Sequence, residues 1–364
     1  MQNLLITGGA GFIGANFVRY WTGRYPQHRI VILDALTYAG NLSNIVSLME
    51  ESRISFVYGD ICNAALVARL FEQYHFDTVV HFAAESHVDR SIVAPDAFIR
   101  TNIQGTHVLL AAALNAWRDN FTGQRFHHIS TDEVYGDLAP GEPPFTESTP
   151  YAPRSPYAAS KASSDFLVRA YHSTYGLPAT ISNCSNNYGP YQFPEKLIPL
   201  MLINALQGQP LPVYGDGSNV RDWLFVEDHC AAIAAILESG DVGETYNIGG
   251  ENEIVNLDLV KELCRQLDAK IAADNSLARR FPKSAPARGK ESASLIRFVK
   301  DRPGHDRRYA INPAKVKERL EFKPATTFAQ GLCASLDWYL HHESWWREIM
   351  SGEHQQWLKQ HYGS

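Results

Sequence analysis

The chain has 364 residues, of which 45% are hydrophobic and 20% are charged. That composition is typical of a folded globular protein, and the formal net charge of −6 disfavours a general nucleic-acid binder. Scattered cysteines without a CxxC pair argue against a disulfide framework, and no apolar run approaches the roughly 20 residues of a membrane helix. Since the N-terminus carries no export signal, we expect a cytoplasmic protein with neither a nucleic-acid nor a membrane partner.

Short β-branched segments alternate with helix-length segments through the first half of the chain. Strands are predicted at Asn3–Thr7, Arg29–Leu33, Ile54–Tyr58, Thr78–Phe82, Arg125–Ser130 and Ala179–Cys184. Near-continuous apolar strands that alternate with helices indicate a parallel sheet covered on both faces. The predicted fold class is therefore α/β, a Rossmann-type doubly wound parallel sheet, with its ligand crevice at the carboxyl ends of the strands.

After about residue 190 this regularity fades, although helices are predicted at Val226–Ser239 and Leu257–Leu267. We therefore predict two domains, with residues 1–190 carrying the Rossmann sheet and residues 191–364 forming mainly a smaller C-terminal substrate-binding domain. Some later segments, such as Gly243–Ile248, are expected to return to the Rossmann sheet.

The first predicted strand runs into a glycine-rich turn, Gly8-x-x-Gly11-x-x-Gly14, that opens a helix. Glycines let the N–H groups of a helix N-terminus approach a pyrophosphate closely, although a plain strand-to-helix turn also uses them. Asp34 ends the second strand, where a carboxylate binds a ribose 2′-hydroxyl and repels a 2′-phosphate. Asp60 and Ile61 follow the third strand, where we expect the adenine. The pattern predicts NAD as the cofactor rather than NADP.

Tyr157 and Lys161 lie four residues apart after Pro156, which suits the first turn of a helix. Their side chains then share one helix face. Because a nearby ammonium ion and an oxidised nicotinamide both favour the phenolate, we expect a lowered Tyr157 pKa and a general base for an alcohol. The alternative is an exposed helix pair without a catalytic role, since Tyr-x-x-x-Lys also arises by chance.

Thr131, Asp132 and Glu133 follow the predicted strand Arg125–Ser130. Two adjacent carboxylates at a strand end form either a simple capping or turn arrangement or an acid/base pair. In an oxidoreductase site such a pair suits a dehydratase, because that reaction moves protons at two carbons.

Together these motifs resemble those of the extended short-chain dehydrogenase/reductase family, and within it the enzymes that dehydrate a nucleotide-linked glucose. The resemblance spans nearly the whole chain, through the stretches Thr7–Gly14, Leu36–Asn41, Ala83–Ile92, His128–Gly136, Tyr157–Lys161, Asn183–Leu200 and Asp301–Tyr309.

The resemblance implies roles for the catalytic residues Thr131, Asp132, Glu133, Tyr157 and Lys161. Tyr157 removes the C4 hydroxyl proton while NAD takes the C4 hydride, and Thr131 hydrogen-bonds that oxygen. Glu133 takes the C5 proton, and a protonated Asp132 gives its proton to the departing C6 hydroxyl. Return of the hydride to C6 leaves a 4-keto-6-deoxy sugar nucleotide and regenerates NAD.

Binding residues follow from the same resemblance. Those implied around NAD are Gly8, Gly11, Phe12, Ile13, Gly14, Asp34, Ala35, Leu36, Thr37, Asp60, Ile61, Phe82, Ala83, Ala84, Ser86, Thr101, Tyr157, Lys161 and Asn187. Those implied around the substrate, expected to be dTDP-glucose, are Ser86, Thr131, Asn186, Lys196, Leu197, Pro212, Tyr214, Arg221, Asn256, Asp301, Arg302 and His305. Thymine is favoured over uracil by the resemblance alone.

Two features in the C-terminal part of the chain can also be explained without a role in substrate binding. Asn256 precedes a predicted helix, so a plain N-cap is an equal interpretation. The stretch Arg279–Arg308 holds ten basic and three acidic residues, and we expect most of it to be a solvated loop. Its first part, within Ala272–Glu291, is longer and more basic than the family pattern.

Other enzymes of the same family remain alternatives: a nucleotide-sugar 4-epimerase, a UDP-glucuronate decarboxylase or a UDP-glucose 4,6-dehydratase. The Asp132–Glu133 pair argues against the first two. A catalytically silent NAD-binding regulator is disfavoured because Tyr157, Lys161 and Glu133 are all present.

The resemblance also implies a homodimer through a helix bundle. Thr101–Trp117 and Pro156–Tyr175 are long helix patterns with broad apolar faces, which the family pairs between subunits. Burial against the protein's own sheet is the alternative. No metal is expected, because the pairs His127–His128 and His341–His342 do not place their rings on one face and no HxxxH motif accompanies them.

Overall fold

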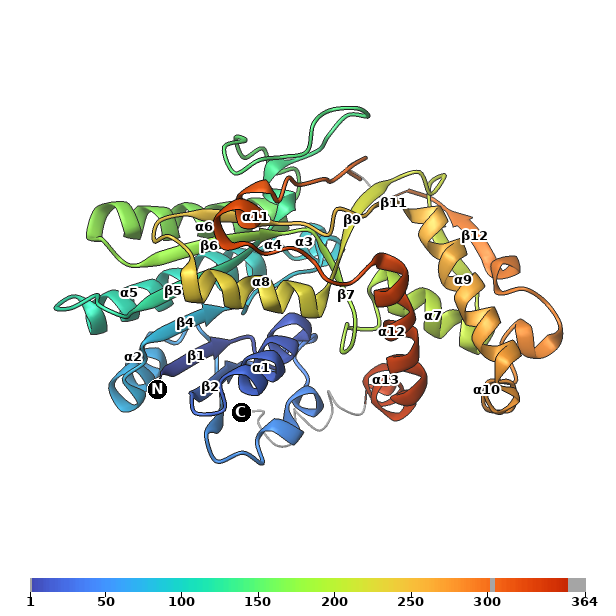
Figure 1. The fold of residues 1–364 in the computed structure, drawn as a ribbon, viewed down its shortest axis with the longest axis horizontal. Coiled ribbons are helices and arrows are strands. Elements are labelled where there is room, and N and C mark those ends of the chain that lie inside the picture. The colour runs from blue at the N-terminus through green and yellow to red at the C-terminus, as the bar shows by residue number, and fades with distance from the viewer. Residues whose placement is uncertain (1, 302–304, 353–364) are drawn as a thin grey trace.

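Seven parallel strands form the central sheet of the computed structural model, which describes residues 2–301 and 305–352 (Figure 1). In spatial order they are β10 (Thr245–Ile248), β6 (Ala179–Cys184), β5 (Arg125–Thr131), β4 (Thr78–His81), β1 (Asn3–Thr7), β2 (Arg29–Asp34) and β3 (Ile54–Tyr58). The predicted strands and the Rossmann-type sheet are confirmed, with ends that shift by one residue at Asp34, His81 and Thr131. The segment expected to return to the sheet contains β10, which pairs with β6.

Helices cover both faces of this sheet because successive strand residues point to opposite sides. Leu4 and Ile6 of β1 pack with α1 (Phe12–Arg24) and α8 (Val226–Ser239). Leu5 faces the other way and packs with α2 (Ala64–Tyr74), α5 (Thr106–Trp117) and α6 (Pro156–Tyr175). Each of these strand residues is fully buried, so β1 forms the centre of a three-layer core.

The two predicted long helices differ in how well their limits match the sequence pattern. α6 begins at Pro156 as predicted, where the Ser155 hydroxyl accepts a hydrogen bond from the Ala158 N–H, and it ends before Gly176 in a left-handed conformation. The helix predicted at Thr101–Trp117 extends further back, through a π-helical stretch (Ile99–Gly105) to α4 (Pro95–Phe98). The shorter α3 (Val88–Val93) precedes it.

A second group of elements lies beside the carboxyl ends of the strands, on the right of Figure 1. Its sheets are β11 (Glu253–Val255), β9 (Val220–Phe225) and β7 (Asn186–Tyr188), and β12 (Ile296–Val299) paired with β8 (Leu211–Tyr214). Its helices are α7 (Leu197–Gln207), α9 (Asn256–Ala273), α10 (Asn275–Arg280), α12 (Phe328–His341) and α13 (Glu343–Ser351). They share an apolar core that includes Trp223 and Trp346. α11 (Ala314–Leu320) belongs with the central sheet, where it packs against β10 and α8.

The basic stretch that was expected to be mostly loop is more ordered than predicted. It includes the end of α10, two short 3₁₀ turns and β12, and β12 pairs in parallel with β8. Leu295 and Ile296 pack against the apolar core of the second group, which anchors the chain despite the basic residues around them. Among the helices of the described ranges, none has the length and apolarity needed to cross a membrane.

Candidate active site

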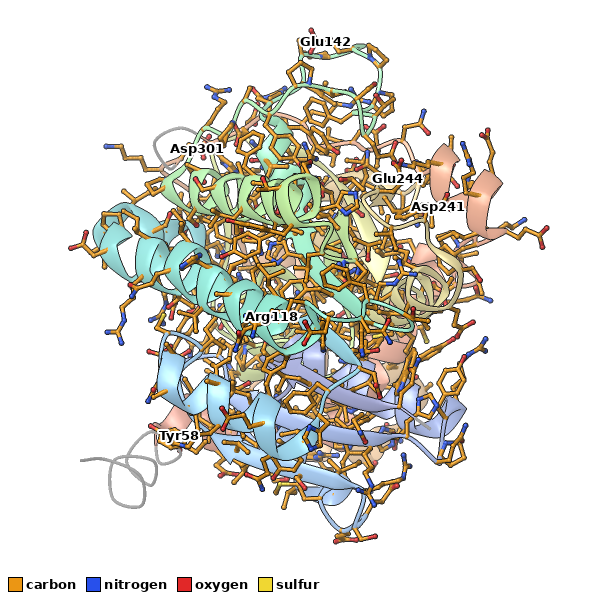
Figure 2. All side chains as sticks on the ribbon, turned by 90° about the vertical axis from the view of Figure 1, so that its left-hand side faces the viewer. Tyr58, Arg118, Glu142, Asp241, Glu244 and Asp301 are labelled. Carbon is orange, nitrogen blue, oxygen red and sulfur yellow. The ribbon has the colours of Figure 1, made fainter. Side chains whose placement is uncertain are left out.

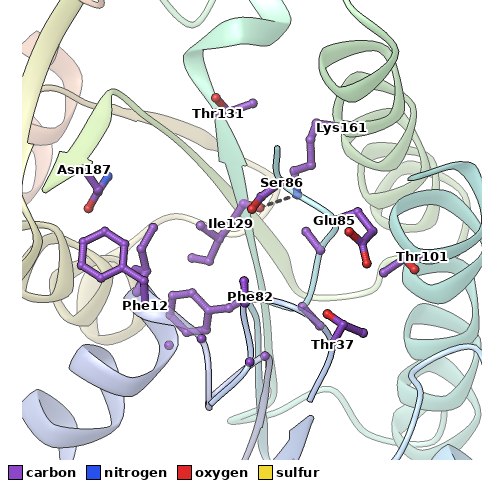
Figure 3. A pocket seen from close by; sticks show the side chains of 18 of the residues that line it. Phe12, Thr37, Phe82, Glu85, Ser86, Thr101, Ile129, Thr131, Lys161 and Asn187 are labelled. Carbon is purple, nitrogen blue, oxygen red and sulfur yellow. Dashed lines mark hydrogen bonds between the residues drawn. The ribbon is translucent and has the colours of Figure 1, made fainter. Parts of the chain in front are cut away.

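A cavity of about 340 Å³ opens at the carboxyl ends of the central strands, between the two groups of elements (Figure 3). Most of the residues singled out in the sequence line it. They are Gly8, Gly11, Phe12, Ile13, Gly14, Asp34, Ala35, Thr37, Asp60, Ile61, Phe82, Ala83, Ala84, Ser86, Thr101, Thr131, Asp132, Glu133, Tyr157, Lys161, Asn186, Asn187 and Lys196. Figure 3 shows Phe12 and Phe82 at one end of the cavity and Thr131 and Lys161 at the other.

The glycine turn is tight enough to require glycine at two positions. Gly8 has a φ of 71°, and a Cβ there would lie 2.5 Å from the backbone nitrogen of Ala83. A Cβ on Gly14 would lie 2.3 Å from the Gly8 carbonyl oxygen. No side chain among residues 2–301 and 305–352 caps the N-terminus of α1, whose first residues Phe12 and Ile13 line the cavity. Helix N–H groups without a cap attract an anion, so this end of the cavity fits a pyrophosphate.

Asp34 is held rigidly at the end of β2. Its Oδ2 accepts a hydrogen bond from the Ala10 N–H (2.9 Å), and its Oδ1 accepts one from the Leu36 N–H (2.8 Å). Burial raises the pKa of Asp34, while these two N–H donors lower it. Each carboxylate oxygen retains a lone pair, so the side chain can still accept hydrogen bonds from ribose hydroxyls. These features fit an NAD molecule along this edge of the sheet. Leu36, in contrast, is buried and does not line the cavity.

Tyr157 and Lys161 project from one face of α6 into the other end of the cavity. Lys161 is only 4% exposed, and its Nζ donates a hydrogen bond to the Ile129 carbonyl oxygen at 2.7 Å. Burial lowers the pKa of Lys161 to about 8. Burial and the charge of Glu133 raise the pKa of Tyr157, and a hydrogen bond with Thr131 opposes this rise. The protein's own groups therefore do not produce the lowering expected from the sequence, and a positively charged nicotinamide would have to supply it.

Thr131, Asp132 and Glu133 connect β5 to a 3₁₀ turn. The Thr131 hydroxyl accepts a hydrogen bond from the Glu133 N–H (3.3 Å) and donates one to Asp132 Oδ1 (3.3 Å). The cap of this turn is thus Thr131 rather than either carboxylate, and both carboxylates lie on the cavity wall.

Asp132 stands out among these groups because its side chain is almost fully buried, at 2% exposure. Its Oδ2 has no hydrogen-bond partner within the described part of the chain. Burial, Glu133 and Asp222 raise its pKa well above the ordinary value, and Arg221 lowers it only in part. A carboxyl group in this environment favours the protonated form, which is the form a general acid needs.

The residues expected at the substrate fall into two sets. Ser86, Asn186 and Lys196 line the cavity, and Lys196 Nζ donates a hydrogen bond to the Ser86 carbonyl oxygen at 3.4 Å. The residues that do not line it are Leu197, Pro212, Tyr214, Arg221, Asn256, Asp301 and His305, and Arg302 lies outside the described residues.

Part of this second set forms its own cluster at the end of the β8–β12 pair. His305 Nδ1 lies 2.6 Å from Asp301 Oδ1, and the His305 ring packs edge-on against Tyr214 at 6.2 Å between ring centroids. The N-cap interpretation of Asn256 is wrong, because Val255 occupies the cap position and the buried Asn256 Oδ1 accepts no hydrogen bond from the described residues.

Arg221 lies on β9, behind Asp132. Its guanidinium packs over the Tyr309 ring at 4.4 Å and donates hydrogen bonds to the carbonyl oxygens of Val220 (2.8 Å) and Asp306 (2.9 Å). Because it lowers the pKa of Asp132, its charge reaches the catalytic end of the cavity.

Several lining residues were not singled out from the sequence, among them Glu85, Gln192 and Phe193. All three lie inside stretches that the family resemblance already covered, next to Ser86 or before Lys196. Their position in those stretches was the available signal. Within residues 2–301 and 305–352, no three histidine, cysteine, aspartate or glutamate side chains gather in a way that could hold a metal ion.

Comparison with models of known protein families finds one that matches most of this chain. The family model described as GDP-mannose 4,6 dehydratase matches residues 5–334. The chain belongs to this family. Among relatives of the family, a dTDP-glucose 4,6-dehydratase of Salmonella typhimurium is 52% identical, with 99% of each chain covered. One of Xanthomonas campestris pv. campestris is 53% identical, with 97% of each chain covered.

Solved structures of the family agree with these relatives. A dTDP-glucose 4,6-dehydratase from Streptomyces venezuelae, crystallised with NAD bound, superposes with a TM-score of 0.84. It is 46% identical, and the match covers 95% of this chain and 99% of that one.

Proposed function

We infer that this chain is an NAD-dependent dTDP-glucose 4,6-dehydratase, which converts dTDP-glucose to dTDP-4-keto-6-deoxyglucose and water. The observation that carries this conclusion is the pair Asp132 and Glu133 on the wall of the cavity that Tyr157 and Lys161 also line. The relatives that share about half of this sequence over nearly its full length carry the same name. The product is a 4-keto-6-deoxy sugar nucleotide, a precursor for deoxysugar biosynthesis such as that of rhamnose.

The cofactor end of the cavity would hold NAD through the uncapped N-terminus of α1 and the Asp34 carboxylate. When bound, NAD supplies an acceptor for the C4 hydride and returns a hydride to C6. The carboxylate of Asp34 would repel a 2′-phosphate, which favours NAD over NADP.

At C4, the proposed general base is Tyr157. Its phenolate takes the proton of the C4 hydroxyl, and the Thr131 hydroxyl, which already hydrogen-bonds Tyr157, holds the same oxygen. The Lys161 ammonium favours the phenolate electrostatically.

At C5 and C6, each of the two carboxyl groups carries out one of the proton transfers that eliminate water. The Glu133 carboxylate takes the C5 proton, which the neighbouring 4-keto group makes acidic. Asp132 gives its proton to the C6 hydroxyl, which leaves as water. C5 is reprotonated when the hydride returns to C6, which completes the 4-keto-6-deoxy product. The raised pKa of Asp132 supports this role, because the acid must carry its proton before the step.

Incubation of the purified protein with dTDP-glucose and with UDP-glucose tests the proposed function and its nearest alternative. We expect NMR to identify dTDP-4-keto-6-deoxyglucose, formed in preference to the UDP-linked product. Formation of dTDP-galactose would indicate an epimerase, and no reaction of either nucleotide would contradict the proposal.

We also propose that the protein forms a homodimer. Large apolar side chains are exposed along α3, the π-helical stretch and α6: Ile92, Val93, Ile99, Phe166 and Tyr175, with Val93 at 85% exposure. Figure 2 shows α5 and α6 next to one another on the face turned to the viewer. Because such a patch suits a subunit interface, we expect light scattering to return about twice the 40.7 kDa of one chain. A mass near that of one chain would contradict the dimer.

Two further parts of the proposal rest on the same organisation. We propose a division into a Rossmann domain of residues 1–190 and a substrate domain formed mainly by residues 191–364. We propose the cytoplasm as the compartment, because all five cysteines are free thiols, as a reducing environment maintains them.

A further inference from the structure

Asp165 is a buried carboxylate that the proposed mechanism does not use. It is 0% exposed and lies on α6, four residues after Lys161 and eight after Tyr157. Residues four apart occupy one face of a helix, so Tyr157, Lys161 and Asp165 form a row of three titratable groups. The row begins at the reaction centre and ends inside the core.

Hydrogen bonds from the neighbouring segments hold the Asp165 carboxylate in place. Its Oδ2 accepts hydrogen bonds from the Ser130 hydroxyl (2.8 Å) and the Tyr151 hydroxyl (3.0 Å). Its Oδ1 lies 3.3 Å from Nε2 of His128. Ser130 directly precedes Thr131 on β5, so the same strand end carries a catalytic residue and a partner of Asp165.

His128 lies between the carboxylate and the catalytic lysine. Its Nε2 is 3.3 Å from Asp165 Oδ1 and 3.4 Å from Lys161 Nζ. Burial and the charge of Lys161 lower the pKa of His128 well below its ordinary value, so the ring is neutral and provides no counter-charge. The anion that raises the pKa of Lys161 most is Asp165.

We propose that Asp165 is a positioning residue, whose negative charge, held one helical turn from Lys161 by Ser130 and Tyr151, keeps Lys161 in its ammonium form. This inference rests on the proposed function, because it assigns the Lys161 charge a part in that reaction. A buried ammonium ion without an anion loses its proton readily, since burial disfavours the charged form. Without that charge, the cavity wall that Lys161 shares with Tyr157 loses a cation that favours the phenolate.

The other titratable groups around the pair act on it from each neighbouring element. Arg169 on α6 lowers the pKa of Asp165 and donates a hydrogen bond to the Tyr151 hydroxyl at 2.9 Å. The groups facing the pair from the remaining elements are His81 on β4, Cys184 on β6, Tyr151 before α6 and Tyr135 on the 3₁₀ turn after β5. Burial raises the pKa of Asp165 to about 6, and that of Lys161 falls to about 8. Asp165 and Lys161 are therefore both charged mainly between about pH 6 and about pH 8.

The pH dependence of kcat in the Asp165→Asn variant tests this role. Removal of the carboxylate lowers the pKa of Lys161 further, so the loss of activity on the basic side should begin at a lower pH. We expect that limb to move by about one pH unit, which lowers the protonated fraction of Lys161 roughly fivefold at pH 8 and roughly tenfold well above it. The defect should shrink toward pH 6, where Asp165 is itself protonated in the wild type, and the KM for dTDP-glucose should stay unchanged.

Asp228 provides a matched control, since it is also buried and accepts hydrogen bonds from the Ala325 and Thr326 N–H groups (3.0 and 3.1 Å). Asp228→Asn should lower stability without moving the pH profile. Asp165→Glu should return the basic limb toward the wild-type position, which a purely structural role would not predict.

Tyr151→Phe keeps the proposal testable if Asp165→Asn does not fold. It removes one hydrogen bond to the Asp165 carboxylate and so raises the Asp165 pKa, which should move the acid limb to higher pH. A fall in kcat by the same factor at every pH, in either variant, would overturn the role of Asp165 while leaving an active wild type and the proposed function intact. A wild type that does not dehydrate dTDP-glucose would overturn the proposed function and this inference with it.

Discussion

The two ends of the candidate site are built in different ways. At the cofactor end, backbone groups and one buried carboxylate follow strand ends that are close in sequence, from Gly8 to Asp34. The proposed nucleotide end is the cluster of Tyr214, Asp301 and His305, which meet beside a short two-stranded pair and lie outside the main cavity. The first end is fixed by the main chain, and the second by side chains from distant segments. We therefore expect substitutions at the two ends to differ in kind: large and structural at the first, small and confined to substrate affinity at the second.

The largest effect is expected where the two ends meet, at Tyr157. Tyr157→Phe removes the proposed general base for the C4 hydroxyl, so kcat should fall by ~10²–10⁴-fold. Turnover of dTDP-glucose, followed by NMR, measures the change. Tyr74→Phe, at the end of α2 and away from the cavity, is the control and should leave turnover unchanged. Near-native activity of Tyr157→Phe would remove Tyr157 from the mechanism.

A glycine substitution tests whether the cofactor end depends on the main chain. Gly8→Ala places a Cβ 2.5 Å from the Ala83 nitrogen at a positive φ, so we expect a loss of about 2–5 kcal/mol of stability from strain and overpacking together. Gly123→Ala, at a φ of 81° with open space around it, should lose only about 1–2 kcal/mol. Urea unfolding measures both, and equal losses would show that close packing at Gly8 does not matter.

A substitution of Asp34 tests the part that this buried carboxylate plays at the cofactor end. Asp34→Ala should weaken NAD binding by about 1.5–3 kcal/mol, because a charged acceptor of ribose hydroxyls is lost, and should improve the relative tolerance of NADP. Titration of each dinucleotide by calorimetry measures the preference. An unchanged ratio of NAD to NADP affinity would contradict the placement of the ribose at Asp34.

The smallest effect is expected at the nucleotide end. Tyr214 is 43% exposed and packs against His305. Tyr214→Ala should therefore raise the KM for dTDP-glucose by a factor that corresponds to a loss of about 0.5–1.5 kcal/mol of binding free energy, and it should leave kcat unchanged. Steady-state kinetics separate the two constants. A fall in kcat with constant KM would show that the nucleotide end acts on the chemical step.

The same contrast explains what the sequence could predict. The central strands were predicted to within one residue because β-branched runs and Gly-rich turns are local signals, and the cofactor residues follow those strand ends. The extension of the predicted helix Thr101–Trp117 before Thr101 was missed, because the π-helical stretch packs against α6 and has no periodic pattern of its own.

Long-range contacts account for the rest of what was missed. Asp165 continues the row of Tyr157 and Lys161 on α6. Its proposed role, however, depends on contacts with Ser130 and His128, which lie on β5. The order of the basic stretch depends on the pairing of β12 with β8 and on a core that only the fold assembles. The lining residue Glu85 adjoins a predicted residue, but nothing local distinguishes it from its neighbours.

The proposed mechanism assigns Tyr157 as the base at C4 and Glu133 as the base at C5. The incorporation of deuterium from solvent at C5 tests this assignment most directly. In D₂O the wild type should form dTDP-4-keto-6-deoxyglucose with deuterium at C5, because C5 is reprotonated from a group that exchanges with solvent. Glu133→Gln keeps Tyr157 and Lys161 but removes the proposed C5 base, so deuterium should enter C5 at no appreciable rate and product formation should fall by ~10²–10⁴-fold. Dehydration by Glu133→Gln at nearly the wild-type rate, with deuterium still at C5, would contradict the account.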